Sequence, residues 1–291
     1  MPGDGTPPRA LILTIRCPDA VGIVAAVATF LTAENAFITE SAHYGDPDTG
    51  QFFMRTVFRA ASGDPIDVLS ISDGLRRISE QFAMDWDLHD ANRKMKVVIA
   101  VSKFGHCLND LLHRVETNTI PVEISAVVSN HDTFKERVEW HGIPFHYLPI
   151  TPETKVEQET RLHSVFEACN AELLVLARYM QILSPGLCEK LSGRVINIHH
   201  SFLPGFKGAR PYHQAHVRGV KIIGATAHYV TTDLDEGPII EQAVERIDHT
   251  RTPEDMIHIG QDIESSVLAR AVRWHAERRI LRNGLKTVVF R

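Results

Sequence analysis

The most informative stretch of the chain is RVINIHHSFLPGFKG, residues 194–208. Its β-branched run at 194–198 is typical of a buried strand, and Pro204, Gly205 and Gly208 predict that a loop follows. Side chains at the carboxyl end of a strand in an α/β sheet face the crevice where such proteins bind ligands. Asn197 and His199 are therefore predicted to lie in a crevice at the edge of a sheet.

A second stretch, HYVTTDLDEGP at residues 228–238, adds a carboxylate to this region. Residues 222–230 before it and residues 239–247 after it have the composition of strands. Asp235 is therefore predicted to lie on the connection between two strands. An amide, an imidazole and a carboxylate at the ends of adjacent strands suit chemistry on a small carbonyl group.

The residues before this stretch predict a mostly parallel, doubly wound, Rossmann-like sheet, because strand-like and helix-like segments alternate. The predicted strands are 96–101, 123–129, 145–148 and 173–176, and the predicted helices are 107–117, 133–140, 156–170 and 185–191. A long helix over 253–280 follows the last strand, and Thr252 and Pro253 form its start signal. The fold class is α/β.

Residues 9–90 form a separate α+β pattern. Strands are predicted at 10–15, 36–44, 51–58 and 84–89, and helices at 23–31 and 66–82. The order βαββαβ is that of a ferredoxin-like split unit. The polar residues 90–94 read as a linker, so two domains are expected, 1–90 and 91–291.

The motifs N-I-H, S-x-L-P and F-x-G, followed by H-[YF]-V-x(4)-D-x-G-P, resemble the signature of the formyltetrahydrofolate-dependent formyltransferases and hydrolases. The resemblance extends from about Met95 to the C-terminus. It implies that Asn197, His199 and Asp235 act on the formyl group of a folate, so the folate is the substrate and no separate cofactor is expected.

The segment LARYMQILS, residues 176–184, is similar to the part of this family's fold that lines the folate pocket. The resemblance implies six folate-binding residues: Arg178, Met180, Ile182, Leu183, Gly208 and His228. For Ile182 and Leu183, ordinary core packing is the alternative interpretation.

The three catalytic candidates have side chains that suit the hydrolysis of an N-formyl group. Asn197 can donate to a tetrahedral oxyanion without titrating, His199 can move a proton, and Asp235 can orient the imidazole or the attacking water. Taken singly, an asparagine or aspartate in a turn and a lone histidine are more often structural. Their combination at the family's spacing favours the catalytic interpretation.

The segment SKFGHCLNDLL, residues 102–112, distinguishes between members of the family. Glycinamide ribonucleotide transformylases have a glycine-rich turn here that holds the phosphate of the acceptor, whereas this chain has one glycine and Phe104. The pattern S-x-x-x-H-C-L-x-D-L-L is similar to that of the deformylases, which use water. The resemblance thus implies hydrolysis of 10-formyltetrahydrofolate to tetrahydrofolate and formate, which adjusts the one-carbon pool and supplies formate for purine synthesis. Two alternatives stay open: transfer to an amine acceptor of the glycinamide ribonucleotide type, and a catalytically inactive amino-acid sensor.

The turn DAVGIV, residues 19–24, and the βαββαβ order resemble an ACT domain. That resemblance implies an amino-acid effector at the first domain and a homo-oligomer, either a dimer or a tetramer. The alternative is that this domain serves only for assembly, because a fold does not determine a function.

Composition excludes several other classes. A net charge of −5 offers no basic surface for nucleic acid or an anionic membrane. The four cysteines include no C-x-x-C pair, which favours free thiols in a reducing, cytoplasmic location. A zinc site could be assembled from His199, His200, His213, His216 and His228, but no H-E-x-x-H motif or cysteine pair supports it, so no metal is expected.

Overall fold

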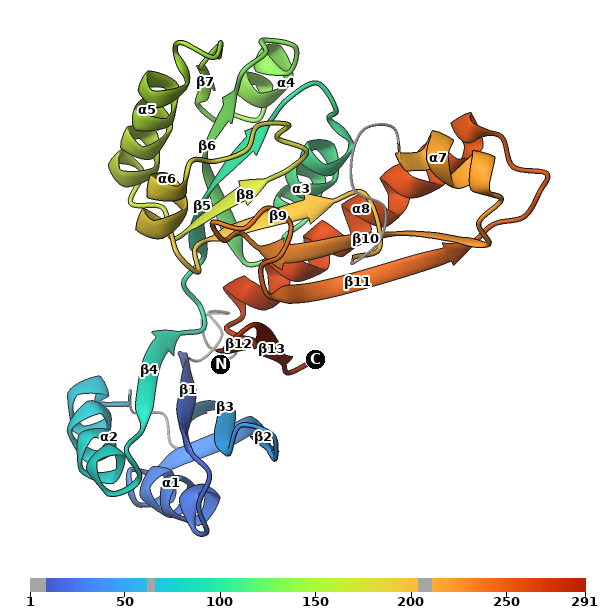
Figure 1. Cartoon of the computed structure of the whole chain (residues 1–291). Helices are drawn as coiled ribbons and strands as arrows, with labels where there is room; N and C mark the ends of the chain where they lie inside the picture. Colours follow the sequence, from blue (N-terminus) through green and yellow to red (C-terminus); the bar gives the residue numbers. More distant parts are fainter. Residues whose placement is uncertain (1–8, 62–65, 204–210) are drawn as a thin grey trace, which may run out of the picture. The chain divides into compact units, whose positions relative to one another are not determined.

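The computed structural model describes residues 9–61, 66–203 and 211–291. The chain divides into two compact units, which Figure 1 shows with their helices and strands labelled. The first unit holds residues up to Arg93 together with Glu277–Asn283 and Val288–Arg291. The second holds Lys94–Ala276 and Gly284–Thr287. C-terminal residues thus return to the first unit, which the sequence analysis did not predict.

The first unit contains a four-stranded antiparallel sheet in the order β2-β3-β1-β4, with the predicted βαββαβ element order. Its elements are β1 (Ala10–Pro18), α1 (Ile23–Ala33), β2 (Ala36–Asp46), β3 (Gln51–Ala60), α2 (Val68–Phe82) and β4 (Asp85–Asp90). Both helices bury apolar side chains, among them Val27 and Leu75, against sheet residues such as Leu13 and Phe58. This burial is the main favourable contribution to the unit's stability.

The C-terminal residues of the first unit bond to the sheet face that the helices leave uncovered. Strand alternation places Arg55 of β3 opposite to Met54, which packs in the helix-covered core. Arg55 is buried and donates from Nε to the carbonyl oxygen of Glu277 and from Nη1 to Glu40. Arg279 also donates to Glu40, at 2.7 Å. C-terminal residues of the same chain therefore occupy part of this face.

The end of the chain differs from the prediction of one helix over 253–280. Helix α8 (Pro253–Ala276) ends earlier, and β12 (Ile280–Asn283) and β13 (Lys286–Val289) form a two-stranded sheet. Gly284, with φ of 60°, lies in the turn between them. The dipeptide Asn-Gly at 283–284, just after the predicted helix, is a hairpin signal that the sequence analysis did not use.

The second unit contains a seven-stranded sheet in the order β11-β10-β9-β8-β5-β6-β7. Strands β5 to β9 pair in parallel, while β10 is antiparallel to both β9 and β11. The elements are β5 (Met95–Val101), α3 (His106–Glu116), β6 (Val122–Ser129), α4 (Lys135–Trp140), β7 (Phe145–Tyr147), α5 (Lys155–Ala168), β8 (Leu173–Leu176), α6 (Pro185–Lys190), β9 (Val195–His199), α7 (Pro211–Arg218), β10 (Ile222–Tyr229) and β11 (Ile239–Arg246). The predicted doubly wound, mostly parallel sheet is confirmed.

Helices cover both faces of this sheet. Leu162 and Phe166 of α5 and Leu187 of α6 pack in one core with alternate residues of the strands, including Val98 and Leu174. Helix α8 packs on β9, β10 and β11 and on α3. Among the described residues, no helix combines the length and apolar character needed to cross a bilayer.

Strand order creates a switch point in the second unit. From β5 the chain proceeds to β6 and β7 on one side, and then returns to β8 on the other side of β5. In doubly wound sheets, ligands bind beyond the carboxyl ends of the strands at such a point. Ser102 follows β5 and Arg178 follows β8, so both residues lie where a ligand site is expected.

Candidate active site

A crevice of about 350 Å³ lies at the carboxyl ends of β8 and β9 and beside the loop between β10 and β11. This volume lies within the usual range for small-molecule sites. The crevice is lined by eight of the nine site residues predicted from the sequence: Arg178, Met180, Ile182, Leu183, Asn197, His199, His228 and Asp235. Gly208, the ninth, lies outside the described residues.

Strand register brings Asn197 and His228 together. Asn197 and His199 are two residues apart on β9, so their side chains point to the same face of the sheet. In the antiparallel pairing of β9 with β10, Asn197 stands opposite His228 and His199 stands opposite Thr226. Opposed residues on one face are within reach of each other, and Asn197 Nδ2 lies 3.2 Å from His228 Nε2.

Asp235 joins the two histidines. Its Oδ2 lies 3.2 Å from His199 Nδ1, and its Oδ1 lies 3.6 Å from His228 Nε2. Burial alone would raise the pKa of Asp235, but the hydrogen bond from His199 outweighs burial and holds this pKa well below its usual range. Asp235 is therefore a carboxylate at neutral pH. Its backbone φ is 57°, which is unusual for a residue other than glycine.

The contacts of His228 determine its tautomer and the orientation of Asn197. His228 Nδ1 lies 2.9 Å from the carbonyl oxygen of Tyr229, which can only accept, so Nδ1 carries the proton. In the neutral ring, Nε2 then accepts from the side-chain NH₂ of Asn197. One N–H of Asn197 is used in this bond, and the other is available to donate into the crevice. His228, which is 2% exposed, thus positions Asn197, while its predicted contact with folate stays a prediction.

His199 presents a basic nitrogen to the crevice. Its Nδ1–H donates to Asp235, so its Nε2 carries a lone pair. Within the described residues, the buried Nε2 atom has no hydrogen-bond partner. A buried polar atom without a partner is costly, and such atoms are found where a ligand supplies the partner. Nε2 is therefore the atom of His199 that a ligand in the crevice could bond to.

Gly237 holds the Asp235 loop against β10. A Cβ on this residue would overlap the carbonyl oxygen of Tyr229, the same oxygen that accepts from His228. We expect Gly237→Ala to lower the free energy of unfolding by about 1–3 kcal/mol and kcat by more than ~10-fold. Urea unfolding and turnover measurements check this. Gly186→Ala, where the added Cβ meets nothing within 4 Å, is the control. Equal turnover in both variants would contradict the assigned role of Gly237.

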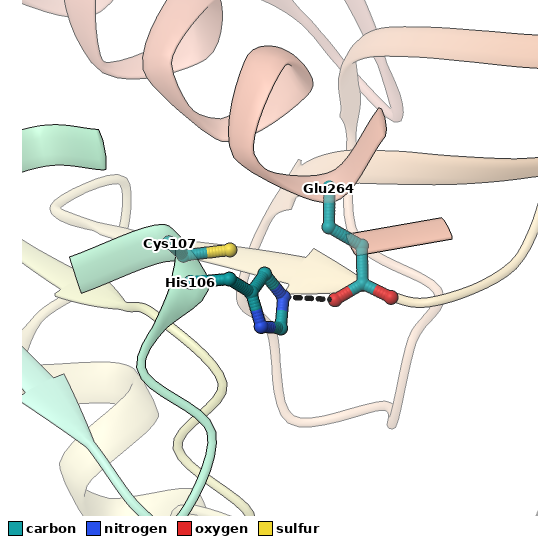
Figure 2. Close-up of side chains that lie close together, drawn as sticks. All are labelled: His106, Cys107 and Glu264. Carbon is teal, nitrogen blue, oxygen red and sulfur yellow. Dashed lines mark hydrogen bonds and ion pairs between the residues drawn. The ribbon is translucent and has the colours of Figure 1, made fainter. Parts of the chain in front are cut away.

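A buried polar cluster borders the crevice, and sequence reasoning missed its central residue, Glu264. Glu264 is 1% exposed and accepts from Tyr212 at 2.8 Å and from His106 at 2.7 Å, and Arg178 Nε lies 3.4 Å away. Figure 2 shows the His106 ring directed at the Glu264 carboxylate. Burial raises the pKa of Glu264, but its bonds with His106 and the charge of Arg178 outweigh burial and lower it overall. The sequence contained one signal that could have identified Glu264. It is a charged residue on the apolar face of α8, four residues after the buried Gly260.

The cluster includes one set of side chains with the spacing of metal ligands. Within residues 9–61, 66–203 and 211–291, the only such group is His106, Cys107 and Glu264. Burial, followed by the charge of Glu264, raises the pKa of Cys107 far above the usual range of a thiol, and Arg178 pairs with the carboxylate. A protonated thiol and an adjacent guanidinium make a poor cation site.

His200 stacks on His199 with ring centroids 5.1 Å apart. Burial, and then the charge of Arg178, lower the pKa of His200 to about 4, so His200 is neutral at neutral pH. The sequence analysis weighed His213 and His216 as zinc ligands, but these residues are exposed on α7.

Comparison with known proteins identifies close relatives of this chain. Residues 95–272 match the model of the formyl transferase family. The formyltetrahydrofolate deformylase of Corynebacterium sp. (strain P-1) is 48% identical over 281 residues, which are 96% of this chain and 98% of the relative. A crystal structure of the formyltetrahydrofolate deformylase of Burkholderia mallei is 50% identical, with a TM-score of 0.93, and covers 98% of this chain and 100% of its own.

A more distant structural relative is glycinamide ribonucleotide transformylase 1 of Symbiobacterium toebii. It is 27% identical, with a TM-score of 0.65, and the match covers 70% of this chain and 98% of the transformylase chain. The similarity to the deformylases thus extends over nearly the whole chain, whereas the similarity to this transformylase does not.

Proposed function

This chain belongs to the formyltetrahydrofolate deformylase family, and from that premise we propose that it hydrolyses 10-formyltetrahydrofolate to tetrahydrofolate and formate. The observation that supports this most directly is the contact of Asp235 with His199 beside Asn197, in one crevice. These groups supply what the hydrolysis of an N-formyl group requires: a base, a donor to an oxyanion and a carboxylate that orients the base.

In the proposed mechanism, Asp235 accepts the Nδ1–H of His199 and keeps the Nε2 lone pair directed at the reacting water. The water oxygen forms a bond to the formyl carbon, and one of its protons moves to His199 Nε2. The free N–H of Asn197 stabilises the oxyanion that develops. The bond between carbon and N10 then breaks, its electron pair goes to N10, and N10 takes the proton from His199. Formic acid loses its remaining proton and leaves as formate.

The apolar side of the crevice suits the pterin ring of the substrate. Met180 and Ile182 are 52% and 59% exposed, so these side chains are available for a ligand rather than buried in the core. Leu183 is 7% exposed and packs in the core on one face of the sheet, and it also lines the crevice. We assign the pterin to the surface of Met180 and Ile182. A folate-bound crystal structure with the pterin elsewhere would refute this placement.

Release of formate without any acceptor is the decisive test of the function. Purified protein is incubated with 10-formyltetrahydrofolate alone, and formate and tetrahydrofolate are quantified. We expect equimolar products in buffer. Loss of the formyl group only after addition of an amine such as glycinamide ribonucleotide would instead establish a transferase. No turnover in either case would support a binding protein.

For the first unit we propose regulation by an amino acid and assembly into a homo-oligomer, a dimer or a tetramer. The turn before α1 exposes Val21 completely, and its Asp19 carboxylate lies against Gly45. A ligand held at this turn and shared by two copies of the chain would favour one quaternary arrangement.

A screen of amino acids against formate release, with light scattering to measure molecular mass, tests the regulatory proposal. We expect one amino acid to change turnover at least ~3-fold, and Asp19→Ala to abolish this response without changing basal turnover. The absence of any response in wild type would leave the unit with a role in assembly only. A monomer in light scattering would refute the oligomer.

A further inference from the structure

Arg178 has two features that ordinary packing does not explain. Its side chain is only 10% exposed, yet its Nε and Nη1 atoms have no hydrogen-bond partner among the described residues. Its φ of 63° lies in the left-handed region, which favours glycine. A strained backbone and unpaired buried donors are both typical of functional sites.

Neighbouring groups hold the guanidinium of Arg178 in place. Glu264 Oε2 lies 3.4 Å from Nε, and the guanidinium carbon lies 5.3 Å from the ring centroid of Phe104. The Arg178 carbonyl accepts from the Ser102 N–H, and Ser102 Oγ in turn accepts from the Met180 N–H at 3.0 Å. These contacts tie Arg178 to the ends of both strands at the switch point. Its position is therefore determined before any ligand arrives.

Arg178, whose Nη1 has no hydrogen-bond partner among the described residues, and His199, whose Nε2 has none, line one crevice. Both residues line it, together with His200, which stacks on His199 and lies close enough to Arg178 for the guanidinium charge to lower its pKa. The site thus offers N–H donors from a guanidinium beside a basic nitrogen. That combination fits a small oxyanion whose oxygen comes from water, because guanidinium N–H groups form strong, charge-assisted hydrogen bonds with carboxylate oxygens.

The charges around this position support the same ligand. Asp235 is ionised and lies beside His199, so it repels a second anion in the crevice. His200 is neutral, and the charge of Glu264 is shared among His106, Tyr212 and Arg178. Among the described residues that line the crevice, Arg178 is the one with a guanidinium or ammonium group, so its positive charge offsets the repulsion by Asp235. Without it, a carboxylate formed at His199 would have no counter-charge among these groups.

We propose that Arg178 and His199 form a subsite for formate, in which the guanidinium of Arg178 donates through Nη1 to the oxygens of formate and of the tetrahedral intermediate that precedes it. One of these oxygens comes from the water that His199 deprotonates, and the other is the formyl oxygen. This inference rests on the proposed function. It changes the role of Arg178, which the family resemblance assigned to folate binding, to a residue that contacts the reacting atoms.

Formate binding measured without folate tests the subsite. The linewidth of ¹³C-formate is titrated by NMR against wild type, Arg178→Gly and Arg178→Lys, and Arg137→Lys on α4 serves as the control. Glycine tolerates the left-handed φ, so Arg178→Gly is expected to fold, and Arg178→Lys provides a second variant. We expect the Kd for formate to rise at least ~10-fold in Arg178→Gly and several-fold in Arg178→Lys, because lysine lacks the planar fork. The control should match wild type, and acetate should bind more weakly than formate.

Turnover supplies an independent measurement. We expect kcat to fall about 10²-fold in Arg178→Gly, with KM for 10-formyltetrahydrofolate changed less than ~3-fold, and added guanidinium to restore part of the rate. Unchanged formate binding in both variants would overturn the subsite. A large rise in KM with unchanged formate binding would return Arg178 to folate recognition. If wild type released no formate from the folate but still bound it through Arg178, the subsite would stand and the proposed function would fail.

Discussion

Asp235→Asn is expected to lower kcat for formate release by about 10³-fold, with KM for the folate within ~3-fold of wild type. Asparagine keeps the shape of the side chain but removes the charge that orients His199 at 3.2 Å. Its NH₂ group can also donate to His199 Nδ1, which places the proton on Nε2 and removes the base. A wrong tautomer of this kind is costly in other hydrolases that use an Asp–His pair.

Steady-state turnover and folate binding by fluorescence or calorimetry check this expectation. Asp262→Asn is the control, because Asp262 is exposed on α8 and does not line the crevice, and we expect its turnover within ~2-fold of wild type. A folded Asp235→Asn protein with near wild-type turnover would show that the carboxylate has no catalytic role.

His199→Gln is expected to lower kcat by about 10²–10⁴-fold, because glutamine can form hydrogen bonds but cannot accept the proton of water at neutral pH. Since His199 and Asp235 act as one unit, the double variant His199→Gln with Asp235→Asn should have a kcat only slightly below that of the less active single variant. The hydrogen bond between Asn197 and His228 does not involve His199, so we expect it to persist in His199→Gln. We also expect the variant to bind the folate.

Turnover of the two single variants and the double variant under identical conditions completes this cycle. Multiplicative losses in the double variant would mean that the two residues act in separate steps, and the proposed path of the proton would be wrong. Near-equal losses in all three variants would support the shared unit.

Most of the architecture could be predicted because local sequence patterns determine it. The β-branched run that ends at Ile198, the alternation of strands and helices and the βαββαβ order correspond to elements of the structure. The C-terminal hairpin had a local signal in Asn283 and Gly284, but the attachment of the chain end to the first unit had none. Glu277 and Arg279, just before the hairpin, bond with Arg55 and Glu40, which lie more than 200 residues away in the chain. Local pattern carries no information about such partners.

The sequence by itself determined which side chains could perform the chemistry, because Asn197, His199 and Asp235 occur in motifs with a specific spacing. Only the tertiary structure decided how they are connected. The register of β9 and β10 sets His228 against Asn197, and the loop between β10 and β11 brings Asp235 to both imidazoles. The contact of Glu264 with His106 likewise follows from the packing of α8 against α3. The physical reason is that hydrogen bonds and ion pairs depend on distances of a few ångströms between residues far apart in the chain, and only the packed fold sets these distances.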